Sequence, residues 1–299
     1  MSLLTASRPR PVNPANDDVK AFVLKRADEF TMIPAAAMEA MQVGRNPACS
    51  VKEYARIIGR DHRLMVEILG MANSWLYSTG TPVMNLVDAI NRLGLAKCQQ
   101  LILTTCTTAL VKKLPIKHPQ LRQQLWRHGY LTAAVCTHLN QELRLQFNGE
   151  EFTAGLLHDL GRYLIAATAP ELYLQVVSAI GTDTRRPLDV ERAMLGTDHC
   201  EIGREFAIRN KLPAPLVAAI QHHHTPHAAG EHSTIATMVG EAAEYASRRE
   251  HEQPGVDPDL EVVPRSPRST DLTRWRNVVS TLTRDFTEKV YAEAKRLIP

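Results

Sequence analysis

The segment from residue 154 to residue 162 places a histidine and an aspartate side by side within an apolar run. It reads Ala-Gly-Leu-Leu-His-Asp-Leu-Gly-Arg, so His158 and Asp159 stand where their neighbours favour burial. Burying such polar groups costs free energy unless they find partners, and a metal ion accepts an imidazole and a carboxylate at once. The pair therefore indicates a metal site, of the kind that metal-dependent phosphohydrolases use or retain as a remnant.

Two further histidines fall on the apolar faces of predicted helices. His128 replaces an apolar residue in a stripe that runs from Leu121 to Leu139 in steps of three and four residues. Such steps place side chains on one face of a helix. His199 precedes Ile202 by three residues, close to a predicted helix start. Both imidazoles are expected to point inward.

The run of three histidines at 222–224 is resolved by the same helical phase. An apolar stripe of Leu216, Val217 and Ile220 continues onto His223 and His224 at the next three- and four-residue steps. His222 falls beside that face. We expect His223 and His224 to join the site and His222 to stay outside it.

Imidazoles from four helices and one carboxylate form a donor set that suits Fe, Mn, Zn or a similar divalent ion. Asp159 could bridge two ions about 3.5–4 Å apart, as in two-metal hydrolytic sites. A single inward histidine is more often a satisfied core residue, and a purely structural polar core is the alternative here. Several unpaired buried imidazoles are unfavourable, however, and a shared site satisfies them. Arg162, one turn after His158, could neutralise a phosphate or lie on the helix surface.

The elements that carry these residues are predicted to be helices throughout. No long alternating β-branched run appears, and aromatic residues make up only 5% of the chain, so strands have little support. Prolines at 115 and 119 mark the main internal boundary. We expect a loose arm over residues 1–18, a helical subdomain over 19–114, a second one with the histidines over 119–251, a Pro-rich linker over 252–270 and an amphipathic helix over 271–299, with Asp271 as its N-cap.

The composition of the 299 residues excludes several classes of protein. No apolar run reaches 18 residues, so no membrane span is expected. The net charge of +3 is small for this length and gives no reason to expect nucleic acid as a partner. The five cysteines show no CxxC spacing and read as reduced, buried thiols of a cytoplasmic protein.

These residues resemble the HD superfamily, named for the pair that stands here as His158-Asp159. The span from about Phe22 to Tyr245 looks like the HDOD domain, the HD-related output domain of bacterial signalling proteins. The motifs that carry the resemblance are Ile33-Pro34, Ala72-Asn73-Ser74-Trp75-Leu76-Tyr77, the segments 86–94, 125–128 and 155–161, Asp198-His199-Cys200-Glu201-Ile202-Gly203, Leu212-Pro213 and His223-His224-Thr225-Pro226. The resemblance implies an N-terminal helical subdomain followed by a C-terminal HD-like helical bundle.

The resemblance also implies a ligand set for a divalent metal (Fe, Mn, Mg, Zn or Ni), as one or two ions. In catalytic HD enzymes a first histidine, the His-Asp pair and a late aspartate bind one metal. The matching positions here are His128, His158 and Asp159, with Glu241 in place of the late aspartate. In HD-GYP enzymes, which open cyclic dinucleotides, three further histidines bind additional metal, and their places are taken here by His199, His223 and His224.

Two departures from the enzymes bear on function. Thr225-Pro226-His227-Ala228 stands where Gly-Tyr-Pro is expected, and Arg162 replaces a lysine. The first interpretation is therefore a standalone signal-transduction output or adaptor protein, non-catalytic or weakly catalytic, that binds signalling partners through its C-terminal helix or forms a homodimer. The alternative is a phosphohydrolase acting on a nucleotide or cyclic dinucleotide, with Asp159 and Arg162 as catalytic residues.

Overall fold

The computed structural model describes residues 18–30, 35–44, 49–73, 80–147, 149–182, 186–251 and 272–297. Every regular element in these ranges is helical, which confirms the all-α prediction. The elements are α1 (Val19–Ala27), α2 (Ala35–Val43), α3 (Val51–Ile58), α4 (His62–Ala72), α5 (Leu86–Leu93), α6 (Leu95–Lys113), α7 (Pro119–Leu143), α8 (Glu150–Leu157), α9 (Leu160–Thr168), α10 (Pro170–Thr182), α11 (Pro187–Leu195), α12 (His199–Arg209), α13 (Ala214–His222), the 3-10 helix η1 (Pro226–His232), α14 (Ser233–His251), α15 (Thr273–Ser280) and α16 (Arg284–Leu297). The expectations for the arm over 1–17, Ile33-Pro34, residues 74–77, the linker over 252–270 and the cap at Asp271 lie outside the described residues.

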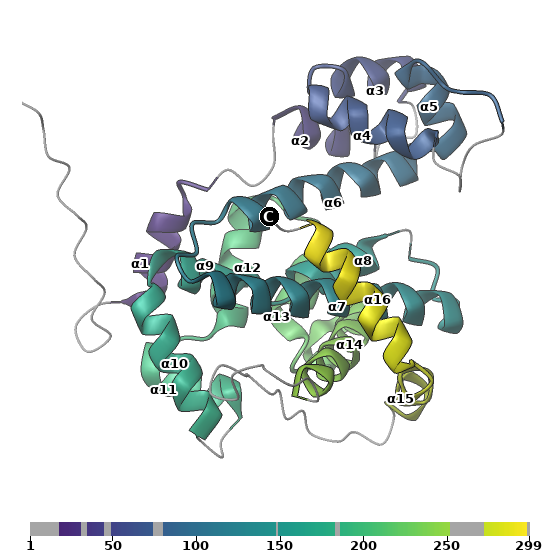
Figure 1. The fold of residues 1–299 in the computed structure, drawn as a ribbon. Helices are drawn as coiled ribbons and strands as arrows, with labels where there is room; N and C mark the ends of the chain where they lie inside the picture. Colours follow the sequence, from purple (N-terminus) through teal and green to yellow (C-terminus); the bar gives the residue numbers. More distant parts are fainter. Residues whose placement is uncertain are drawn as a thin grey trace, which may run out of the picture.

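The long helix α6 connects two groups of helices (Figure 1). Helices α2 to α5 form the smaller group above it, and the histidine-bearing helices lie below. Cys98, Ile102 and Cys106 are buried at four-residue spacing along α6, as expected for one face of a helix. The hydroxyl of Thr104 shares a hydrogen bond of 3.1 Å with Thr153 in α8. Helix α6 thus packs against both groups and connects the smaller one to the histidine-bearing one.

Helix α1 belongs in space to the histidine-bearing group. It packs against α9 and α12 and not among α2 to α5 (Figure 1). Its apolar face, which includes Val19 and Val23, is buried there. Arg26 donates a hydrogen bond of 3.2 Å to the carbonyl oxygen of Thr168 at the end of α9. The predicted subdomain over 19–114 therefore contains one helix, α1, that packs with the histidine-bearing group.

The C-terminal region forms two helices, where the sequence analysis predicts one. Helix α15 ends at Ser280 and α16 begins at Arg284. The hydroxyl of Thr281 donates to the carbonyl oxygen of Val278 at 2.7 Å, and the hydroxyl of Thr283 accepts from the backbone N–H of Phe286 at 3.2 Å. Serine and threonine compete for backbone groups in this way and favour helix ends, which a count of apolar positions does not register.

Both C-terminal helices pack within the chain. Helix α16 lies against α7, and α15 lies against α14 and α7. The indole of Trp126 donates a hydrogen bond of 3.0 Å to the carbonyl oxygen of Ala294, and Ala294 itself is fully buried. Much of the apolar face of this region is thus buried within the chain, while Trp275, Val278 and Phe286 stay partly exposed.

Among the described residues, no helix combines the length and the hydrophobicity that crossing a membrane requires.

Candidate metal centre

Four histidines from separate helices surround the carboxylate of Asp159. Its Oδ2 lies 3.7 Å from Nε2 of His128 in α7 and 3.4 Å from Nε2 of His158, which follows α8. Its Oδ1 lies 3.2 Å from Nε2 of His199 in α12 and 3.7 Å from Nε2 of His223, which follows α13. The two carboxylate oxygens therefore face two different pairs of imidazoles.

His224 completes the cluster. Its ring centroid lies 4.1 Å from that of His223 and 5.3 Å from that of His199. Its Nε2 is buried, and no hydrogen-bond partner for it exists in the described part of the chain. Six of the seven residues predicted to bind metal thus come together.

The donor atoms fall into two groups that share a border at Asp159. One donor atom from each of His128, His158 and Asp159 lies within 4.8 Å of the others, and the same holds for a second group that consists of His199, Cys200, His223 and His224. Cys200 was not among the predicted ligands, because it matches no cysteine motif. The unpaired Nε2 of His224 and the two groups of closely spaced donor atoms are suited to binding a divalent ion.

The joint between α8 and α9 positions the central pair. His158 caps the end of α8, and Asp159 caps the start of α9. Close behind the pair, a Cβ atom at Gly161 would lie 1.9 Å from the carbonyl oxygen of His199. Because glycine has no Cβ, α9 can lie directly against the first turn of α12. This contact brings His199 to Asp159.

Hydrogen bonds from Nδ1 turn two of the imidazoles toward the cluster. Nδ1 of His158 donates to the carbonyl oxygen of Gly155 at 2.8 Å, and Nδ1 of His223 donates to that of Ile220 at 3.1 Å. A carbonyl oxygen only accepts, so Nδ1 carries the proton and Nε2 of the neutral ring offers a lone pair. Burial lowers the pKa of both histidines, which favours the neutral rings.

Carboxylates hold the other two imidazoles. Nδ1 of His199 lies 2.7 Å from Oε2 of Glu191, and Nδ1 of His128 lies 3.2 Å from Oε2 of Glu250. Carboxylates in this position orient metal-binding histidines and raise their basicity. Neither glutamate was among the predicted site residues. A signal existed for Glu191, since it lies four residues before the buried Leu195 on the inner face of α11.

The electrostatics of the cluster leave room for a dication. Burial alone would raise the pKa of Asp159, but Arg162 and His158 hold it well below its ordinary value. When ionised, Asp159, Glu191 and Glu250 carry three negative charges, and Arg162 carries one positive charge. Burial lowers the pKa of His128 and of His199, but Glu250 beside the first ring, and Cys200 and Glu191 beside the second, outweigh it and raise both pKa values. Protons on these two rings balance the remaining charge of the metal-free cluster, and a divalent ion that displaced them would supply the same charge.

Arg162 is a buried ion-pair partner and does not lie on a helix surface. Its Nη1 donates to Oδ2 of Asp159 at 3.1 Å, and its Nε lies 3.5 Å from Oε1 of Glu191. Nη2 is buried, with no hydrogen-bond partner among the described residues. The guanidinium group thus holds the central carboxylate in place, and neither its Nε nor its Nη2 donates a hydrogen bond within the described residues.

Glu241 does not join the cluster, contrary to the prediction from the resemblance. Its Oε2 accepts a hydrogen bond of 3.2 Å from Nε of Arg276 in α15. In the described part of the chain, no hydrogen bond or ion pair links Glu241 to the histidines. The phase of α14 turns this residue toward the C-terminal helices, whereas Glu250 on the same helix reaches His128.

Replacing Arg276 by methionine is expected to lower the free energy of unfolding by about 1–3 kcal/mol, because it leaves the buried carboxylate of Glu241 without its partner. Methionine retains an apolar stem, so little packing is lost. Urea denaturation measures the change. Arg284→Met, which breaks an exposed pair with Glu288 in α16, is the control and should cost about 0.5 kcal/mol or less. Equal losses in the two variants would contradict a structural role for the Glu241 pair.

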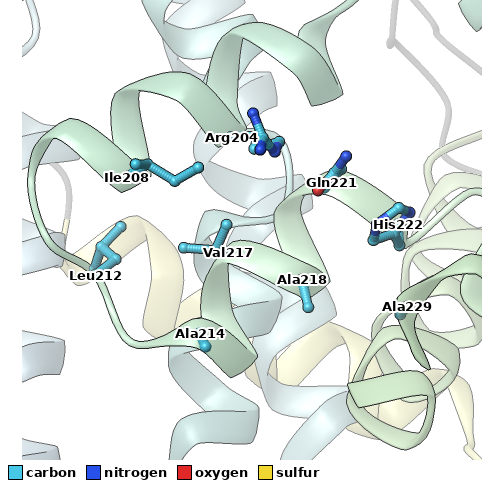
Figure 2. Close-up of a pocket in the computed structure, with 9 residues that line it drawn as sticks. All are labelled: Arg204, Ile208, Leu212, Ala214, Val217, Ala218, Gln221, His222 and Ala229. Atoms are coloured by element: carbon cyan, nitrogen blue, oxygen red, sulfur yellow. The ribbon is translucent and has the colours of Figure 1, made fainter. Parts of the chain in front are cut away.

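Two pockets lie on the α12–α13 side of the cluster. One of about 380 Å³ is lined by Cys200, Thr225, Arg192 and six other residues, so it borders the second donor group at Cys200. The other, of about 370 Å³, lies between α12 and α13 (Figure 2). His222 lines both pockets. This histidine belongs to neither donor group, as the helical phase predicts.

Comparison with family models finds the HDOD domain in residues 30–226. The chain is also 24% identical over 220 residues to an uncharacterized protein of Treponema pallidum (strain Nichols), which corresponds to 73% of this chain and 42% of that protein. The chain thus spans less than half the length of this relative.

Solved structures show the same fold. An HDOD domain protein of unknown function from Geobacter sulfurreducens superimposes with a TM-score of 0.66 at 22% identity, over 93% of this chain and 98% of the other. A protein from Shewanella amazonensis SB2B, described as a candidate phosphohydrolase, gives 0.61 at 24% identity, over 93% and 94%. A protein from Marinobacter aquaeolei VT8, described as a candidate signal transduction protein, gives 0.52 at 20% identity, over 95% and 66%.

Proposed function

Because the chain belongs to the HDOD domain family, we propose that it is a signal-transduction output or adaptor protein whose histidine-bearing half holds a divalent metal ion. The observation that carries the proposal is the convergence of imidazole Nε2 atoms on Asp159, with each Nδ1 of four rings engaged by a carbonyl or a carboxylate. The description of the Marinobacter aquaeolei protein supports the signalling context.

The donors of this centre come from α7, the α8–α9 joint, α12 and α13, so a bound ion would tie these elements together. Metal binding that requires the folded arrangement stabilises the fold by mass action, by about 4 kcal/mol when the free ion exceeds its dissociation constant a thousandfold. The ion would then act as a structural or sensory element. The partners of such a protein would be signalling proteins. A second copy of the chain would be another partner, and sedimentation analysis of the pure chain tests for such a homodimer.

The direct experiment measures metal in the purified protein and thermal unfolding before and after chelation. We expect a divalent ion in the protein as isolated, a lower Tm after chelation and recovery on reloading. Protein that contains no metal, takes up none and unfolds at the same temperature with or without chelator would overturn the metal centre.

The paired substitutions His223→Ala and His222→Ala test which histidines form the centre. His223→Ala is expected to reduce metal content and to cost about 1–3 kcal/mol of stability, because it removes a donor and leaves other buried polar groups unpaired. His222→Ala is expected to change neither quantity, since this residue lines the pockets outside the cluster. Elemental analysis and urea denaturation of both variants provide the measurement. Loss of metal in His222→Ala, or full metal content in His223→Ala, would contradict the assignment.

The second candidate function is phosphohydrolysis on a nucleotide or cyclic dinucleotide. Two observations favour it: a pocket that borders the cluster at Cys200, and the buried Nη2 of Arg162, which has no hydrogen-bond partner among the described residues. A metal ion held by His128, His158 and Asp159 would lower the pKa of a bound water to near 7. Arg162 would hold Asp159 in place and donate Nη2 to a phosphate oxygen.

A turnover screen separates the two functions. The protein loaded with Mn, Fe or Mg is incubated with nucleotides and cyclic dinucleotides, and release of product is measured. Turnover that Arg162→Met reduces would support phosphohydrolysis. Bound metal without turnover on any of these substrates would instead support a structural or sensory centre.

A further inference from the structure

Cys200 stands at the edge of the donor cluster, and neither the family resemblance nor the comparisons assign it a role. Its Sγ lies 3.4 Å from Nε2 of His199, and Nε2 of His199 lies 3.4 Å from Nε2 of His223. Together with His224, these residues form a group whose donor atoms all lie within 4.8 Å of one another. Three imidazole nitrogens and one sulfur are thus gathered on the α12–α13 side of Asp159.

Two of the separations match those between ligands of a single ion, and the others are at most 4.8 Å. Zinc binds imidazole at about 2.0–2.1 Å and thiolate at about 2.3 Å in a tetrahedron, which places two neighbouring donors about 3.3–3.6 Å apart. The two contacts of His199 have this spacing. His224 adds a buried Nε2 without a hydrogen-bond partner among the described residues, as expected of a nitrogen whose lone pair is available to a metal ion.

Two features of its position bear on whether Cys200 can be a ligand. Burial raises the pKa of its thiol, whereas His199 and the partial positive charge at the N-terminus of α12, of which Cys200 is the second residue, favour the thiolate. A metal ion deprotonates a coordinating thiol outright, so the raised pKa does not prevent ligation. The residue is 5% exposed and lines the pocket of about 380 Å³. The buried Cys136 in α7 belongs to neither donor group.

We propose that Cys200 is a metal ligand and that His199, Cys200, His223 and His224 form a mixed nitrogen–sulfur site for zinc or a comparably thiophilic dication. The proposal rests on the metal centre proposed above and adds the identity of its sulfur donor. On binding, the S–metal bond replaces the S–H bond, the proton passes to solvent and the ion stays divalent. Oδ1 of Asp159, 3.2 Å from Nε2 of His199, links this site to the group of His128 and His158.

Cobalt(II) substitution of the 299-residue chain tests the proposal. Cobalt bound by any of these donors gives visible ligand-field bands, whereas only cobalt bound to a thiolate adds an intense near-ultraviolet charge-transfer band. We expect both in the wild type, loss of the charge-transfer band alone in Cys200→Ser, and both bands retained in Cys136→Ser. Ligand-field bands without the charge-transfer band in the wild type would overturn the sulfur donor and leave the metal centre standing. Absence of all cobalt bands would overturn both.

Alkylation of the wild-type protein gives a second measurement that needs no variant. Iodoacetamide labelling is followed at each cysteine by peptide mass mapping, with and without bound zinc. Because a metal-bound thiolate is shielded, zinc should slow labelling of Cys200 about tenfold or more. Labelling of the half-buried Cys49 should stay unchanged. Equal labelling of Cys200 with and without bound zinc would reject the proposal.

Discussion

Replacing Asp159 by asparagine is expected to abolish metal binding and to lower the free energy of unfolding of the metal-free protein by about 3–5 kcal/mol. The substitution conserves shape but leaves the buried guanidinium of Arg162 with only Glu191, whose Oε1 lies 3.5 Å from Nε. Breaking a buried ion pair from one side is costly because the remaining charge cannot return to water. Elemental analysis gives the metal content, and urea denaturation in the presence of a chelator gives the stability.

The chain contains a matched control for this experiment. Asp189 and Arg186 also form an aspartate–arginine pair three residues apart, at 2.9 Å, but their side chains are 35% and 56% exposed. An exposed pair contributes about 0.2–1 kcal/mol at most. Asp189→Asn should therefore leave metal binding intact and change stability little. A loss in Asp189→Asn as large as that in Asp159→Asn would show that burial is not the source of the effect.

The stability difference between the wild type and Asp159→Asn is expected to depend on pH in a defined direction. Arg162 and His158 outweigh burial and hold the pKa of Asp159 well below its ordinary value, so its ionised form stabilises the fold. That contribution is complete above the pKa of the unfolded chain, near 4, and is lost as the pH falls through the lower pKa of the folded state. In chelator, the stability difference between wild type and Asp159→Asn should be largest at neutral pH and should shrink below about pH 4.

Much of the site could be predicted from helical phase. The stripe in α7 places His128 inward, and the stripe in α13 separates His223 from His222. The structure bears this out, since His128 and His223 are buried against Asp159 while His222 lines the outer pockets. Phase works here because each of these residues extends an apolar face whose burial is strongly favoured.

The partners around the imidazoles were harder to predict, because they depend on which helices meet. Glu250 lies near the end of α14 and reaches His128 only through the packing of α14 on α7. Glu241 occupies a position that the family resemblance assigns to the site, yet α15 lies beside it and supplies Arg276. A linear pattern contains neither the crossing of two helices nor the competition between two partners for one carboxylate.

Gly161 is the position where a single methyl group is expected to do the most damage. A Cβ atom there would lie 1.9 Å from the carbonyl oxygen of His199 and 2.8 Å from its Cα, so backbone must move to admit it. Separating α9 from α12 would also withdraw Nε2 of His199 from Asp159. Gly161→Ala should therefore cost about 3 kcal/mol or more and should remove bound metal, as measured by urea denaturation and elemental analysis.

Gly70→Ala is the control that separates this steric effect from the ordinary cost or benefit of alanine in a helix. Gly70 lies inside α4, and a Cβ atom there meets nothing within 4 Å. Alanine loses less conformational entropy than glycine on folding, so this variant should gain about 0.5–1 kcal/mol and keep its metal. Changes of opposite sign in the free energy of unfolding of the two variants would locate the damage at the α9–α12 contact. A Gly161→Ala protein that is stable and keeps its metal would show that the two helices can separate without disturbing the centre. The contact and the centre are expected to fail together, because the backbone of His199 that meets Gly161 belongs to the same residue whose imidazole meets Asp159.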